Sequence, residues 1–285
     1  MPTWKEKAKI YWRHPDIHVY WRAILAELLG TAIFVFLGTS SAVFANKNEP
    51  VTVALGHIFG LLVCIHIFGP ISGAHFNCAV TFGALITRNI GLVSGIVYMI
   101  AQIVGSIVGA ALTTLIGKTV VPGIFKPPED IDDAWRGFAL EIILTFVLVL
   151  AIFGAAVKPQ HFKKSNGLHS ITGLIAAFPI AFALGADAMA GALTGASMNP
   201  ARAFGPQVVG GVWYAHSWIY YTAPFIGAAL GAIVYEFLLT KPKKLQHYTS
   251  LLHINTNYDD SDDEKDQEED LRSQQSNALL YTTNH

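Results

Sequence analysis

The amino-acid sequence predicts an all-α membrane protein with six transmembrane helices and two re-entrant half-helices, arranged as an inverted repeat. Three observations lead to this prediction. The 285 residues are 52% hydrophobic and only 14% charged, whereas a soluble domain carries about 25% charged residues. Six stretches are long and apolar enough to cross a bilayer. The motifs of the first half of the chain recur in the second half.

The apolar stretches follow from the thickness of a bilayer, whose core requires about 20 mostly apolar residues per helix. The stretches that qualify are 22–45, 52–69, 91–116, 136–157, 169–190 and 216–239. Two shorter apolar pieces, 78–87 and 200–210, each follow an asparagine and are too short to span. We interpret them as half-helices, which a membrane tolerates only where protein or water covers the broken backbone.

The two halves share three kinds of element in one order. The segment "AELLGTAIFVFLG" (26–38) is similar to "LEIILTFVLVLAIFG" (140–154), and "SGAHFNCAV" (72–80) is similar to "TGASMNPAR" (194–202). With three spans per repeat, the second repeat enters the membrane upside down, and such repeats place a functional site near the midplane. We therefore divide the membrane domain, 22–240, into repeats of about 22–116 and 136–239.

Charge distribution predicts the topology. Basic residues concentrate in the N-terminal segment 1–21, in the loop that follows 157 and just after 240, whereas the loop 118–135 is acidic. The positive-inside rule then places both termini in the cytoplasm of a multi-pass protein. Residues 241–285 lack apolar periodicity and hold an acidic run, which predicts a disordered cytoplasmic tail. The plasma membrane and the membrane of an intracellular vacuole both fit these features.

The composition also excludes several classes of site. The two cysteines, Cys64 and Cys78, lie in apolar surroundings, which argues against a disulfide scaffold or a zinc site. No feature supports an enzyme, a cofactor or nucleic-acid binding.

Two asparagines carry the functional hypothesis. Asparagine is a good helix N-cap, and a helix N-terminus offers unpaired N–H groups and partial positive charge. If Asn77 and Asn199 cap half-helices that meet at the midplane, their amide groups face a file of water, and cations and protons meet an unfavourable field. Glu27 and Glu141 then hold the half-helix loops from inside the bundle. Ordinary helix caps remain the alternative.

The motifs resemble those of the aquaporin, or major intrinsic protein, family over about residues 20–240. "NPAR" followed by "FGP", the partner "SGAHxN" and the paired glutamates carry the resemblance. It implies a passive water channel in the bilayer, with one pore per subunit and usually a homotetramer. The second box, Asn199-Pro200-Ala201, matches the family. The first box, Asn77-Cys78-Ala79, has cysteine where the family has proline. We expect Cys78 to lie near the pore, where a thiol reagent reaches it.

The resemblance also implies a four-residue selectivity filter. Counting from the box asparagines, the filter positions are His57, Asp187, Ala196 and Arg202. Aspartate beside the arginine is unusual for the family, and a one-residue register shift replaces Asp187 with Ala186 or Ala188. If Asp187 faces the pore, an ion-coupled transporter remains an alternative.

Other positions separate water channels from glycerol channels in this family. Those that favour water here are Ala203, Gln207, Tyr220 and Tyr221. The small Ala196 together with His57 still leaves room for ammonia or hydrogen peroxide. A facilitator of glycerol or another small neutral solute and a closed-pore junction or scaffold protein remain alternatives.

A regulatory hypothesis concerns the loop 158–170, which is cytoplasmic by the charge rule. Its candidate gate residues are His161, Phe162, Ser165 and His169. Phenylalanine can plug a vestibule, histidine titrates near neutral pH, and a kinase would add negative charge at the serine. Ser261 in the acidic tail is a second candidate phosphorylation site. An ordinary solvated loop is the alternative.

Overall fold

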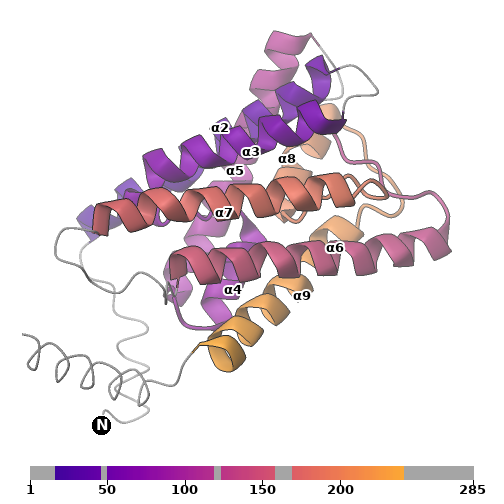
Figure 1. Cartoon of the computed structure of the whole chain (residues 1–285). Helices are drawn as coiled ribbons and strands as arrows, with labels where there is room; N and C mark the ends of the chain where they lie inside the picture. Colours follow the sequence, from indigo (N-terminus) through magenta and orange to yellow (C-terminus); the bar gives the residue numbers. More distant parts are fainter. Residues whose placement is uncertain (1–16, 46–49, 119–122, 158–168, 241–285) are drawn as a thin grey trace, which may run out of the picture. The chain divides into compact units, whose positions relative to one another are not determined.

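The computed structural model describes residues 17–45, 50–118, 123–157 and 169–240, without the side chains of 17–20 and 169–174. Six long helices lie in this part of the chain together with two short ones (Figure 1). The long helices are α2 (Ile17–Phe44), α3 (Pro50–Ser72), α5 (Leu92–Gly117), α6 (Ile131–Ile152), α7 (His169–Ala190) and α9 (Ile219–Ile233). The short helices are α4 (Cys78–Ile86) and α8 (Pro200–Gly210). The order is that predicted from the sequence, with three long helices and one short helix in each half.

Two of the long helices continue as π-helical turns. The turn η1 (Phe153–Val157) extends α6, and η2 (Val234–Leu239) extends α9. With these turns included, five helices of the described chain are long and apolar enough to cross a membrane, and α7 adds the apolar segment Ile175–Ala190. The compact unit ends at Leu239.

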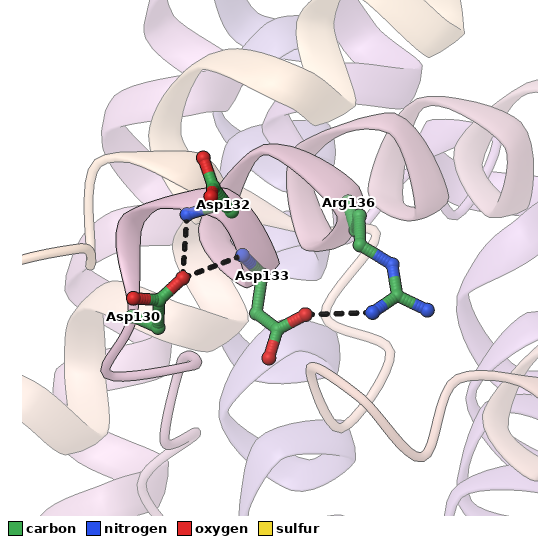
Figure 2. A network of polar contacts seen from close by, with 4 residues as sticks. All are labelled: Asp130, Asp132, Asp133 and Arg136. Carbon is green, nitrogen blue, oxygen red and sulfur yellow. Dashed lines mark hydrogen bonds and ion pairs between the residues drawn. The ribbon is translucent and has the colours of Figure 1, made fainter.

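The start of α6 differs from its predicted position. The helix begins at Ile131 rather than at 136, because Asp130 caps it (Figure 2). The Asp130 carboxylate accepts hydrogen bonds from the backbone N–H groups of Asp132 at 2.8 Å and Asp133 at 3.4 Å. Asp133 in turn pairs with Arg136 at 2.7 Å. Acidic side chains in a first turn also interact favourably with the helix dipole.

The two halves of the chain repeat one packing scheme. Helix α2 packs against α3 and α5, and α6 packs in the same way against α7 and α9. Each short helix packs against the last long helix of the other half, α4 against α9 and α8 against α5. Both half-helices are therefore held between the repeats.

Glycines allow the closest helix contacts in both halves. A Cβ atom on Gly105 of α5 would lie 2.3 Å from the Leu28 carbonyl oxygen of α2. A Cβ atom on Gly227 of α9 would lie 2.4 Å from the Ile142 carbonyl oxygen of α6. Small residues allow this close backbone approach, which drives helix association in membranes.

Candidate pore

The loops that precede the two half-helices have the same unusual backbone. In the first loop, Gly73, Ala74 and Phe76 have positive φ angles of 89°, 53° and 49°. In the second, Gly195, Ala196 and Met198 have φ angles of 84°, 56° and 50°. Left-handed conformations cost residues other than glycine roughly 1–2 kcal/mol each, so both loops need strong hydrogen bonds to persist.

Buried carboxylates supply those hydrogen bonds. Glu27 of α2 accepts from the backbone N–H groups of His75 at 2.9 Å and Phe76 at 2.8 Å. Glu141 of α6 accepts from the backbone N–H groups of Ser197 and Met198, both at 2.8 Å. Both glutamates are fully buried. Charge-assisted hydrogen bonds are roughly twice as strong as neutral ones, so each glutamate fixes one loop.

A hydroxyl group completes each of these two networks. Ser72 donates to Glu27 at 2.6 Å and accepts from the Ala74 N–H at 3.0 Å. Thr194 donates to Glu141 at 2.7 Å and accepts from the Ala196 N–H at 3.2 Å. The correspondence extends the sequence repeat from motifs to individual hydrogen bonds.

The side chains of Asn77 and Asn199 cap the short helices. The Asn77 Oδ1 accepts from the Ala79 N–H at 2.8 Å. The Asn199 Oδ1 accepts from the N–H groups of Ala201 at 3.0 Å and Arg202 at 3.3 Å. Each cap satisfies backbone donors that a helix N-terminus leaves unpaired.

The amide nitrogens of the same asparagines cross between the repeats. The Asn77 Nδ2 donates to the Met198 carbonyl at 2.9 Å, and the Asn199 Nδ2 donates to the Phe76 carbonyl at 2.9 Å. An amide NH₂ group carries two N–H bonds. One bond of each group is therefore engaged, and the other remains for a molecule in the adjoining cavity.

Cys78 does not lie where we expected it. It is 3% exposed, and its Sγ approaches the Met99 carbonyl oxygen of α5 at 3.7 Å. Cys78 is not among the residues that line the cavity described below. The side chain at the first position of α4 therefore points into the packing with α5, and the expectation of a pore-facing thiol is corrected. Its counterpart Pro200 occupies the same position of α8 and is also buried.

A cavity of about 1800 Å³ runs beside both asparagines. It follows α3 from Pro50 to Pro70, which is about 30 Å at the helical rise of 1.5 Å per residue. That length is about the thickness of a bilayer core. The wall is mostly apolar. Its polar members include His57, His66, His75, Asn77, Ser197, Asn199 and Arg202.

Arg202 and His57 meet in this wall. The His57 Nδ1 lies 2.8 Å from the Val53 carbonyl oxygen and therefore carries a proton, which leaves Nε2 as an acceptor. The Arg202 Nε donates to this Nε2 at 3.3 Å. Arg202 is 2% exposed, and Ala196 lines the same cavity. Three of the four filter residues expected from the sequence thus lie in the wall.

Asp187, the fourth, does not line the cavity; Ala188 does. Asp187 is 4% exposed, and its Oδ2 has no hydrogen-bond partner among the described residues. Counting back twelve residues from Asn199 gave the wrong register, because the loop between α7 and Asn199 is not helical and its length is not fixed by helical spacing. An error of one residue turns a side chain by about 100° around a helix.

Phe125, a residue that sequence reasoning did not single out, lies against Arg202. The Arg202 Cζ is 4.3 Å from the centroid of the Phe125 ring, and the Arg202 Nη1 donates to the Gly123 carbonyl at 3.1 Å. Gly123 and Phe125 both line the cavity. An aromatic residue in a loop has no periodic signal in the sequence, so only the three-dimensional contact reveals Phe125.

Farther along this loop, a hydrogen bond between Lys126 and Glu129 raises the pKa of the lysine and lowers that of the glutamate.

The residues expected to separate water from glycerol channels lie outside the cavity wall. Tyr220 donates to the Thr194 carbonyl at 2.7 Å. Tyr221 donates to Gln207, whose Nε2 donates to Ser217 at 2.7 Å. Ala203, also buried, packs against Tyr220. These positions shape the wall indirectly, by fixing α8 and its preceding loop.

The candidate gate residues lie outside what can be described. His161, Phe162 and Ser165 fall in the segment 158–168, and the side chain of His169 is likewise not described. Within the described ranges, no group of three His, Cys, Asp or Glu side chains is arranged to hold a metal ion.

Comparison with known proteins places the sequence in context. The model of the family described as "Major intrinsic protein" matches residues 13–235. A probable aquaporin TIP-type of Medicago truncatula is 42% identical over 235 residues, covering 79% of this chain and 88% of that protein. Aquaporin TIP1-1 of Arabidopsis thaliana is 40% identical over 228 residues, covering 75% of this chain and 86% of that protein.

The fold has a solved counterpart. The X-ray structure of the aquaglyceroporin from Plasmodium falciparum superposes with a TM-score of 0.68 and covers 77% of this chain and 97% of that one. At 21% identity, the likeness concerns the fold alone. It confirms the predicted all-α membrane architecture.

Proposed function

Because the chain belongs to the Major intrinsic protein family, we propose that it is a passive channel that conducts water down osmotic gradients. The observation that carries the proposal is the position of Asn77 and Asn199, whose amides lie in the wall of a cavity that follows α3 over about 30 Å. The names of the TIP-type aquaporin relatives support the same substrate.

The mechanism rests on fixed hydrogen-bond donors in an apolar wall. Water that reaches the two half-helix ends turns its oxygen toward the free N–H of each asparagine. The partial positive charge of both helix N-termini, together with Arg202, opposes the entry of cations and protons. Along the rest of the wall, which is mostly apolar, each water has few hydrogen bonds to the protein to break as it moves. No covalent step is involved.

A second substrate class has its own support. Ala188 and Ala196 both line the cavity, and these small side chains leave more room than bulky ones beside His57 and Arg202. Ammonia and hydrogen peroxide, which are close to water in size, are therefore candidate substrates. Glycerol is larger and is disfavoured by the aromatic residues behind the wall, Tyr220 and Tyr221.

Stopped-flow light scattering of proteoliposomes tests these proposals. We expect a sucrose gradient to shrink vesicles that contain the protein several-fold faster than empty vesicles, and a glycerol gradient to give slow re-swelling. Re-swelling in glycerol as fast as the water response would overturn the water-selective proposal. Shrinkage at the rate of empty vesicles would favour a closed-pore junction or scaffold protein.

The assembly and the membrane of residence are further proposals. We infer a homotetramer from the family, which the mass of the purified protein in detergent tests. We also infer a vacuolar membrane from the TIP-type relatives, with both termini cytoplasmic from the distribution of basic residues. Fractionation of membranes that carry a tagged protein tests the location, and protease protection of each terminus tests the topology.

Regulation is proposed from the sequence of the loop 158–170. We propose that Phe162 can plug the cytoplasmic vestibule and that phosphorylation of Ser165 by a kinase, or charge on His161 or His169, changes this block. Deletion of residues 160–166 should then raise water permeability in proteoliposomes. An unchanged permeability at equal protein content would count against the gate.

A further inference from the structure

Helices α2 and α3 approach each other closely on either side of His57. A Cβ atom on Gly56 of α3 would lie 2.3 Å from the Ser41 Oγ of α2, and a Cβ atom on Gly60 would lie 3.3 Å from the Leu37 Cβ. Glycine at both positions therefore allows the two helices to pack closely. His57 lies between these two glycines in α3, so its imidazole has to fit into a narrow space.

The His57 imidazole lies against the backbone of Gly38 in α2. A Cβ atom on Gly38 would lie 2.4 Å from the His57 Nε2 and 2.5 Å from its Cδ2. In proteins a Cβ atom essentially never comes within 3.0 Å of another heavy atom of this kind, so the ring takes this position because residue 38 has no side chain. The atom in closest contact is the same Nε2 that accepts from Arg202 at 3.3 Å.

Further contacts hold the His57 ring on its other sides. Its Nδ1 lies 2.8 Å from the Val53 carbonyl oxygen, and the Phe34 ring meets it edge to face with the centroids 5.8 Å apart. The Ser41 hydroxyl donates to the Gly38 carbonyl at 2.8 Å and lies 3.4 Å from the Val53 carbonyl oxygen. Ser41 thus joins the two backbone segments on either side of the imidazole. The side that stays open to the ring is that of the cavity, whose wall it forms.

From these contacts we infer that Gly38 is a positioning residue of the pore, which sets how far the His57 imidazole projects into the cavity. Without a side chain at residue 38, the imidazole lies back against α2 and its Nε2 accepts from Arg202. A methyl group at residue 38 would push the ring in the direction that is open, toward the cavity, and would disturb the hydrogen bond with Arg202. The width available to water thus depends on a residue that does not itself line the cavity. This inference rests on the proposed channel function.

Gly38→Ala tests the inference in proteoliposomes. The methyl group moves the imidazole into the path of water, so we expect the water permeability at equal protein content to fall several-fold. We also expect the activation energy of water transport to rise, because each water passes a narrower site. The activation energy does not depend on how many channels work. A lower permeability at an unchanged activation energy would therefore reflect fewer working channels and would overturn the inference.

The double variant Gly38→Ala/His57→Ala separates this steric role from helix packing. Without the imidazole the new methyl group displaces nothing in the wall, so Gly38→Ala should leave the permeability of the His57→Ala protein unchanged. Residues that act through one contact are coupled in this way. An equal fall in both backgrounds would overturn the inference, because the methyl group would then act on the packing of α2 against α3. If Gly38→Ala alone does not fold, His57→Ala should restore folding, and a double variant that also fails to fold would overturn the inference.

Gly60→Ala is the matched control. Gly60 lies at the same contact between α2 and α3, but the atom nearest to a Cβ there is the Leu37 Cβ at 3.3 Å, and His57 is not among its neighbours. A small shift of the leucine accommodates this methyl group, so the permeability and the activation energy should both stay at the wild-type values. If Gly60→Ala changes both as much as Gly38→Ala does, the inference is wrong. Failure of the wild-type protein to conduct water would instead refute the proposed function.

Discussion

Asn77 and Asn199 each donate an amide N–H to the loop that carries the other, at 2.9 Å to the carbonyl oxygens of Met198 and Phe76. Each amide oxygen at the same time caps its own short helix. The same side chains thus join the two repeats and fix the two helix N-termini. Because the oxygen and one N–H of each amide are already hydrogen-bonded, the direction of the second N–H is fixed before any substrate arrives.

Asn199→Ala should impair both structure and conduction. It removes a cap and a hydrogen bond between the loops, which together contribute about 1–3 kcal/mol to the free energy of unfolding. We expect a lower melting temperature in detergent and slower water transport per channel. Asn77→Ala should behave in the same way. Loss of stability without any loss of conduction by the surviving channels would show that the amides only stabilise the fold.

Glu141→Gln should destabilise the second loop. The carboxylate accepts hydrogen bonds from Thr194, Ser197 and Met198, and an amide replaces one acceptor oxygen with a donor. A buried N–H then loses its partner, at a cost of about 1–3 kcal/mol. Thermal unfolding in detergent measures the change. The control is Glu129→Gln at an exposed residue, and equal melting shifts in the two variants would contradict the prediction.

The sequence predicts the parts of this fold that depend on periodicity and repetition. The apolar lengths fix the long helices, and the recurring motifs identify Glu27 with Glu141 and Asn77 with Asn199. The hydrogen bonds of these four residues agree with that pairing. The two glutamates lie within long helices and the two asparagines directly precede short ones, so helical geometry fixes their positions.

Counting along the sequence did not fix the positions that depend on loop geometry, although it left Ala188 open as an alternative to Asp187. Ala188 replaces Asp187 in the wall because a non-helical segment separates α7 from Asn199. Phe125 is separated from Arg202 by about a third of the membrane domain in sequence, and no spacing rule relates them. The direction of the Cys78 side chain depends on how α4 packs against α5. All three positions depend on tertiary contacts, which local sequence patterns do not reveal.

Cysteine accessibility tests the register of α7. The wild-type protein should keep its water permeability in a membrane-impermeant mercurial, because Cys64 and Cys78 are buried away from the cavity wall. Ala188→Cys should be blocked by the same reagent, since Ala188 lines the cavity. Ala186→Cys, on an exposed face of α7, is the matched control and should not be blocked. Inhibition of the wild-type protein would instead indicate that the Cys78 thiol is accessible from the pore.

Asp187→Asn should stabilise the protein and leave water transport near the wild-type rate. Asp187 is buried, and its Oδ2 has no partner among the described residues. An amide has nearly the same size and no charge, so its unpaired group costs less to bury than an unpaired carboxylate oxygen, and we expect a gain of up to about 1–3 kcal/mol. Denaturant titration in detergent and stopped-flow scattering measure the two effects. A large change in solute selectivity would place this side chain in the filter after all.

Cys78→Pro should fold and conduct water at the wild-type rate. Asn77, the preceding residue, has φ −151° and ψ 122°, which is the extended conformation that a following proline requires. The first helical position also needs no N–H, and proline there already has its φ angle set. The loss of the thiol contact with Met99 offsets part of the gain of about 0.4–1 kcal/mol expected from a less flexible unfolded chain. Melting temperature and permeability, compared with Cys78→Ala, separate the two effects. A melting temperature of Cys78→Pro below that of Cys78→Ala would mean that the ring clashes with α5.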